Sequence, residues 1–245
     1  MKFYDPPVGT AVYSIKEDME FARVIDRPNR FLVNVKFHNE VVKAHIHDPG
    51  RLKELIYPGA EITVRRTHGI KTEWSVTTAV LKNEDILLDT RFHNAIASKF
   101  MGQSFRTEVV HGDSRYDFAI DHGFIEVKGC SMQVGKYVIF PDAPTKRGVK
   151  HLTSLAGLKK EGFDCNVLFL IFRKGAESFY PNVMTDPLFE EAFSLAMHNN
   201  VNMLFPKVTV KGNDIVYCGQ CVVGNNPFHD EDFRSEYYKI EHSNK

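Results

Sequence analysis

The chain has 245 residues, 43% of them hydrophobic and 25% charged, which is typical of a globular protein with one large or two small domains. Thirty-one basic residues balance 31 acidic ones, which excludes a global field that attracts polyanions, so any nucleic-acid surface must be a local patch. No apolar run reaches the roughly 18 residues of a membrane span, and Met1-Lys2-Phe3 begins no signal-peptide pattern. We expect a soluble, cytoplasmic protein.

The first ninety residues are typical of short strands separated by turns. One short helix is expected at residues 51–56, before Pro58-Gly59. Such a β-module, with a helix after its third major strand, matches the OB-fold, and a small SH3-like barrel is the alternative. The expected strands are residues 10–16, 19–26, 30–38, 40–47, 61–67 and 74–82.

An OB barrel often binds single strands through basic side chains and aromatic stacking. One hairpin end of the expected barrel has this composition, although a solvated hairpin end would have it too. The residues concerned are Arg65, Arg66, His68, Lys71 and Trp74.

From Leu87 onward the pattern changes to mixed helix and strand, which predicts an α/β domain with a mixed sheet. We therefore predict an OB-like barrel over residues 1–86 and an α/β domain over residues 87–245. The tail from Phe228 is expected on the surface. Helices are expected at residues 90–101, 146–161 and 187–199, and strands at residues 105–111, 115–120, 124–128, 137–141, 165–173 and 201–210.

Charged residues on two neighbouring strands suggest a catalytic site. Because strand side chains alternate between faces, Glu126 and Lys128 project to the same side. The turn at Asp121-His122-Gly123 predicts a hairpin that brings Asp117 beside Glu126. Asp117 and Glu126 could hold Mg²⁺ or Mn²⁺, with Lys128 beside them, as hydrolysis of a phosphodiester requires. The alternative is a solvated ion pair of little energetic weight.

The most basic segment of the chain follows these strands. On a helix, Arg147, Lys150 and His151 share one face, and Lys146 precedes them. A helix start with adjacent cations is a good phosphate site, with Asp142 or Thr145 as its cap. Arg115, two residues from Asp117, is a further candidate. A solvated helix face is the alternative.

Two other motifs have weaker functional interpretations. Cys218 and Cys221 form an isolated C-x-x-C, which could be a metal or redox site, but reduced, inert cysteines are the default in the cytoplasm. His45, His47 and Asp48 could hold a metal, but histidines at strand ends are more often hydrogen-bond partners.

Four blocks of this chain resemble those of the sugar fermentation stimulation protein A family, over the sequence up to about Val210. The family blocks are F-P-D-A-x-T-x-R-G-x-K-H-L, S-R-x-D-F, I-E-V-K and H-x-x-N-T-G-R-M. The matching segments are Phe140-Pro141-Asp142-Ala143-Pro144-Thr145-Lys146-Arg147-Gly148-Val149-Lys150-His151-Leu152, Ser114-Arg115-Tyr116-Asp117-Phe118, Ile125-Glu126-Val127-Lys128 and His45-Ile46-His47-Asp48-Pro49-Gly50-Arg51-Leu52.

The resemblance implies an OB-type domain joined to a domain like the PD-(D/E)xK nucleases. It implies that Asp117 and Glu126 bind the metal and that Lys128 is the motif lysine, with DNA as partner. Asp48-Pro49 replaces the Asn-Thr of the family, and Gly129 replaces a serine. Many such nucleases also use a glutamate from the first helix, which is absent here, and Glu108 is the nearest substitute.

The leading hypothesis is a DNA-binding protein with a divalent-metal phosphodiesterase site. The main alternative is a DNA-binding regulator of sugar metabolism genes that does not cut. A third interpretation makes the barrel a protein-interaction module and the C-x-x-C a redox element. The sequence leaves the oligomeric state open, a homodimer included.

Overall fold

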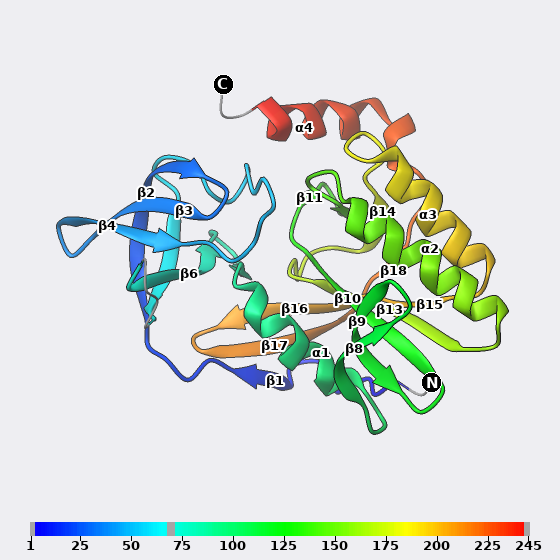
Figure 1. The fold of residues 1–245 in the computed structure, drawn as a ribbon. Helices are drawn as coiled ribbons and strands as arrows, with labels where there is room; N and C mark the ends of the chain where they lie inside the picture. Colours follow the sequence, from blue (N-terminus) through cyan, green and yellow to red (C-terminus); the bar gives the residue numbers. More distant parts are fainter. Residues whose placement is uncertain (1–2, 68–71, 243–245) are drawn as a thin grey trace.

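A closed five-stranded barrel forms the N-terminal part of the molecule (Figure 1). The computed structural model describes residues 3–67 and 72–242. The strands follow the order β4-β3-β2-β5-β6, and a parallel pairing of β4 with β6 closes the ring, which confirms the OB-like barrel. They are β2 (Met19–Asn29), β3 (Leu32–Phe37), β4 (Glu40–His45), β5 (Glu61–Arg66) and β6 (Trp74–Val80).

Two expectations for this region were wrong. Strand β1 (Ala11–Ser14) does not join the barrel but pairs antiparallel with β17 (Asp214–Gln220) of the C-terminal part. No helix forms at residues 51–56, where the chain makes turns. Leu52 has a φ of +50°, which a right-handed helix cannot include. The turn residue His68 lies outside the described residues.

The C-terminal part is built on a mixed sheet. Strand β10 (Gly123–Cys130) pairs parallel with β13 (Asp164–Ile171) and antiparallel with β9 (Ser114–Ile120), which pairs with β8 (Arg106–His111). On the other side, β13 pairs parallel with β15 (Asn202–Leu204) and β16 (Pro206–Lys211). The expected strand 201–210 is thus divided at Phe205. Strand β7 (Asp85–Leu87) pairs with both β6 and β16, so the barrel and the sheet are continuous.

Helices cover both faces of β13. Val167 and Phe169 pack in the core shared with α2 (Lys146–Lys160) and α3 (Pro187–His198), while Leu168 and Leu170 pack in the core shared with the barrel and α1 (His93–Ala97). This is the two-sided burial expected of a continuous apolar strand. The expected helix 90–101 is a short α-helix between two 3-10 turns, η1 (Thr90–Phe92) and η2 (Ser98–Phe100).

The C-terminal tail forms a helix with its own core, which the sequence had not predicted. Helix α4 (Glu231–His242) follows η3 (Pro227–His229) and runs above the sheet toward the barrel in Figure 1. Phe228, Phe233 and Tyr237 are buried against Met132 and Ile139. Beneath them lies a small sheet of β11 (Gln133–Val134), β12 (Tyr137–Phe140), β14 (Ser178–Pro181) and β18 (Val222–Val223).

Within the described ranges, no helix is both long enough and apolar enough to span a membrane.

Candidate active site

Asp117 lies where the pairing of β9 with β10 ends. The ladder reaches Phe118 opposite Ile125 and stops there. One residue further, Asp117 Oδ2 accepts the backbone N–H of Val127 at 2.8 Å. Asn94 Nδ2, from α1, donates to Oδ1 at 3.0 Å. The carboxylate therefore takes the place of a ladder bond and is held from two sides.

Glu126 is buried beside two cationic or potentially cationic groups. Its Oε1 accepts a hydrogen bond from Lys128 Nζ. His151 Nδ1, from α2, lies 2.5 Å from the same oxygen, though off the line of a hydrogen bond. The other oxygen, Oε2, is buried without a hydrogen-bond partner. Glu126 thus has an open acceptor in a site that otherwise satisfies it.

The two carboxylates have opposite pKa shifts. Burial and then the charge of Glu126 raise the pKa of Asp117, more than the N–H groups of Val127 and Asn94 lower it. Burial also acts to raise the pKa of Glu126, but Lys128 and His151 outweigh it and bring that pKa below its usual value. Glu126 is therefore the carboxylate held ionised, and a nearby cation would favour ionisation of Asp117.

A cavity of about 250 Å³ lies beside these residues, at the junction of the barrel and the sheet. Arg30, Asp48 and Gly50 line it from the barrel side, and Lys128 and Gly129 line it from β10. Thr145 caps α2 at the same cavity, since its Oγ1 accepts the N–H of Gly148 at 3.0 Å. Lys128 thus lines the same cavity as the start of the basic helix.

Gly129 is required by a close approach rather than by a ligand. A Cβ there would lie 2.2 Å from Cε1 of His93, whose ring stacks on Phe172. Burial lowers the pKa of His93 to about 4, so its imidazole is neutral near pH 7.

Of the predicted nucleic-acid contacts on α2 and its neighbours, four are exposed and one is buried. Lys146 and Arg147 are exposed in the first turn of α2. Lys150 is exposed and its Nζ donates to the carbonyl of Asp113 at 2.6 Å, and Arg115 forms an ion pair with Glu108. His151 differs from the prediction, because it is buried against Glu126 and has no access to a phosphate backbone.

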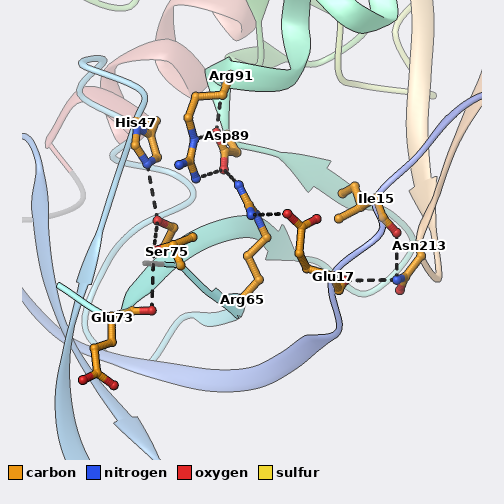
Figure 2. Close-up of polar contacts among 10 residues, drawn as sticks. Ile15, Glu17, His47, Arg65, Glu73, Ser75, Asp89, Arg91 and Asn213 are labelled. Carbon is orange, nitrogen blue, oxygen red and sulfur yellow. Dashed lines mark hydrogen bonds and ion pairs between the residues drawn. The ribbon is translucent and has the colours of Figure 1, made fainter. Parts of the chain in front are cut away.

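Arg65 also differs from the prediction. Its side chain is only 6% exposed and lies between two carboxylates, Asp89 Oδ2 at 2.9 Å and Glu17 Oε1 at 3.1 Å (Figure 2). A buried arginine with two partners is a structural group and not a phosphate ligand. Arg66 is exposed and pairs with Glu73. The other candidates of this hairpin, His68 and Lys71, lie outside the described residues.

The side chains of the two alternative metal motifs make contacts within the fold. His47 Nε2 lies 3.3 Å from Ser75 Oγ, and burial lowers the pKa of His47 to about 4. Asp48 Oδ1 accepts the N–H of Gly50 at 2.8 Å. Cys218 and Cys221 are free thiols, and burial raises the pKa of both, that of Cys221 to about 11. Their thiols donate to the carbonyls of Val216 and Ala176 at 3.5 and 3.4 Å.

The carboxylates suit a hard cation only in part. No group of three or more His, Cys, Asp and Glu side chains in the described part of the chain is arranged to hold a metal. Glu108, the substitute proposed for a helical glutamate, receives a 3.5 Å hydrogen bond from Asn94, which also binds Asp117. Asp117 and the open Oε2 of Glu126 nevertheless offer the oxygen ligands that Mg²⁺ or Mn²⁺ prefers, with water or phosphate oxygens completing the shell.

From the sequence, Asn94 has no predicted role, and Asp142 is only a possible cap of α2. Asn94 orients Asp117, and Asp142 Oδ2 accepts the N–H of Leu52 at 3.3 Å, which ties the barrel loop to the sheet. Both side chains contact residues that are distant in the sequence, and a local sequence pattern cannot predict such contacts.

Comparisons with known proteins agree with this architecture. Residues 25–88 match the family model described as the SfsA N-terminal OB domain, and residues 83–214 match the one described as the sugar fermentation stimulation protein RE domain. The structure of Pyrococcus furiosus SfsA in complex with Ca²⁺ shares the fold, with a TM-score of 0.82 and 23% identity over 88% of this chain and 100% of that one.

Two curated relatives are closer in sequence. The sugar fermentation stimulation protein homolog of Saccharolobus solfataricus is 44% identical over 86% of this chain and 88% of its own length. The homolog of Thermoplasma volcanium is 47% identical over 80% of this chain and 90% of its own length. This chain belongs to the sugar fermentation stimulation protein family.

Proposed function

We propose that this protein binds DNA and hydrolyses its phosphodiester bonds with Mg²⁺ or Mn²⁺. The observation that carries the proposal is the convergence of Asp117 and Glu126 beside Lys128, which lines the junction cavity. The N-terminal barrel of this protein has the OB-fold, which commonly binds nucleic acid, and this supports a polynucleotide substrate. The related Pyrococcus furiosus protein has been observed with Ca²⁺, which is consistent with a cation site in this fold.

Each residue has a separate task in this proposal. Asp117, oriented by Asn94 and Val127, and Glu126, kept ionised by Lys128, would hold the cation. The cation, when bound, would supply Lewis-acid activation and neutralise charge on the phosphate. Lys128 Nζ would donate a hydrogen bond to the attacking water or to a phosphate oxygen. Lys146 and Arg147 would hold the substrate backbone by charge.

Replacement of the motif lysine tests the proposal. Lys128→Ala is expected to lower cleavage of labelled single-stranded, duplex and branched DNA in Mn²⁺ by about 100-fold or more, because the loss of one preorganised hydrogen-bond donor costs about that much. Binding should stay nearly unchanged, since one ammonium of many cations is lost. Cleavage is to be measured by gel, and binding by fluorescence anisotropy in EDTA.

Lys136→Ala is the matched control, because Lys136 is 60% exposed and its ion pair with Glu177 is long, at 3.8 Å. It should cut like the parent protein. Metal-dependent cleavage that persists in Lys128→Ala would contradict the mechanism.

A second candidate function is binding without cleavage, as a regulator of sugar metabolism genes. It is favoured by the absence of a third acidic metal ligand among the described residues and by the ion pair that Lys128 already makes with Glu126. Tight DNA binding with no product in Mg²⁺ or Mn²⁺ would select this function.

A further inference from the structure

A second cavity continues the one beside Lys128. It has a volume of about 490 Å³ and shares five lining residues with the first, namely Arg30, Pro49, Gly50, Ala143 and Pro144. We call the two together the junction groove. One wall is the barrel, from the β2–β3 tip and the loop at residues 49–53, and the other is the segment that leads into α2.

The junction groove carries a local excess of positive charge. Four cationic side chains line the larger cavity, and no carboxylate of the described residues does: Arg27, Arg30, Arg51 and Lys53. In the smaller cavity, Asp48 and Asp142 are engaged with the backbone N–H groups of Gly50 and Leu52. On a protein whose net charge is zero, such a patch has the sign that a polyanion requires.

The cations of the groove differ in the hydrogen bonds and ion pairs that they make within the protein. Arg27 donates to the carbonyls of Arg30 and Gly50 at 2.9 and 2.8 Å, so it shapes the loop. Arg51 Nη1 and Lys53 Nζ each lie 3.0 Å from Glu241 Oε2 of α4. The guanidinium of Arg30 is exposed and has no hydrogen bond or ion pair within the described residues. Arg30 is thus the cation most available to a ligand.

An aromatic surface adjoins Arg30. Phe31 is 48% exposed at the tip between β2 and β3, and its ring lies parallel to that of His45, with centroids 6.2 Å apart. An exposed ring next in the chain to a groove arginine is a surface of the kind on which OB-folds stack unpaired bases. A duplex offers no unpaired base to such a ring, because its bases are paired inside the helix.

We infer that the junction groove is the track of a single-stranded polynucleotide, whose backbone passes Arg30, Arg51 and Lys53 and whose scissile phosphate reaches the cavity at Lys128. This inference deepens the proposed function and rests on it. Glu241 pairs with both Arg51 and Lys53, so a bound strand would compete with its carboxylate for these two cations.

Anisotropy with a labelled oligothymidylate of about 20 nucleotides, longer than one OB-fold occludes, tests the groove. The full chain is used in EDTA, with a hairpin duplex as competitor. The parent protein is expected to prefer the single strand by about tenfold. Arg30→Ala combined with Phe31→Ala should weaken single-strand binding by about tenfold and flatten the log–log salt slope by about one unit. Glu241→Gln should strengthen binding.

Arg23→Ala is the matched control, because Arg23 is an arginine of the same barrel, 61% exposed, and lies outside the groove. Thermal unfolding of each variant verifies that it is folded. Unchanged single-strand affinity in the Arg30→Ala, Phe31→Ala variant, with affinity lost on Lys146→Ala and Arg147→Ala, would overturn the groove and leave the proposed function standing. Absence of binding to any nucleic acid would overturn both.

Discussion

At the scale of the residue, the packing of the barrel against the second domain changes the pKa of Asp48. It lies in the loop that Asp142 holds against the sheet, and burial, with the charge of Asp142, raises its pKa to about 6. The unperturbed value is 3.8. Because the folded pKa exceeds the unfolded one, this group favours folding below about pH 4, and that contribution is lost as the pH rises through about 6.

Asp48→Asn is therefore expected to stabilise the protein at pH 8 by about 1–2 kcal/mol and to have little effect at pH 4. The amide oxygen can still accept the N–H of Gly50, and asparagine is the residue that the resembling family block has here. Urea unfolding at the two pH values measures the change. A stabilisation that is equal at both would show that charge is not its cause.

At the scale of the element, helix α4 was not predicted from the composition of the C-terminal tail. Its acidic sequence suggests a solvated tail, yet Phe233 and Tyr237, four residues apart, pack with Phe228 of η3 against Met132 and Ile139. Burial of that apolar face stabilises the helix, as in most short amphipathic helices. Its last turn then places Glu241 against the barrel loop.

Phe233→Ala is expected to lower the free energy of unfolding by about 3 kcal/mol, because it leaves a cavity in the small core under α4. Tyr238→Ala is the matched control, since Tyr238 is on the same helix and 44% exposed, and it should cost less than about 1 kcal/mol. Chemical denaturation followed by circular dichroism measures both. Equal losses in the two variants would contradict the buried role of Phe233.

At the scale of the whole molecule, a buried ion network joins the barrel to η1, the turn that precedes α1. Asp89 is fully buried and accepts from Arg65 of β5 and from Arg91 of η1. Its contacts with Arg65 and Arg91 are drawn in Figure 2. Asp89 also caps η1, which leads into α1 and Asn94. Burial acts to raise the pKa of Asp89, but its bonds to Arg91 and Arg65 prevail and lower it. The barrel, the cap of η1 and the orientation of Asp117 are thus mechanically linked.

Asp89→Ala is expected to destabilise the protein by about 3–5 kcal/mol, because Arg65 would remain buried without its inner partner. Glu73→Ala removes an ion pair whose side chains are both 70% exposed and should change stability by less than about 0.5 kcal/mol. Thermal unfolding gives the comparison. A small effect of Asp89→Ala would mean that water reaches Arg65 readily. The ion network would then contribute little to the free energy of unfolding.

Local pattern was sufficient for much of the fold. Alternation and turn residues predict the barrel strands, and a continuous apolar run predicts β13, because those signals depend on near neighbours in the chain. They also place Glu126 and Lys128 on one face and identify Thr145 as a possible cap of α2. The charges of the candidate site were visible for the same reason.

Tertiary structure decided what those charges contact. It placed β1 in the second sheet, buried Arg65 and His151, and brought Asn94 to Asp117. It also formed the junction groove from segments more than ninety residues apart, such as Arg51 and Pro144. Sequence alone could not reveal these outcomes, since a charged side chain has the same local signature whether it meets solvent, a buried partner or a ligand.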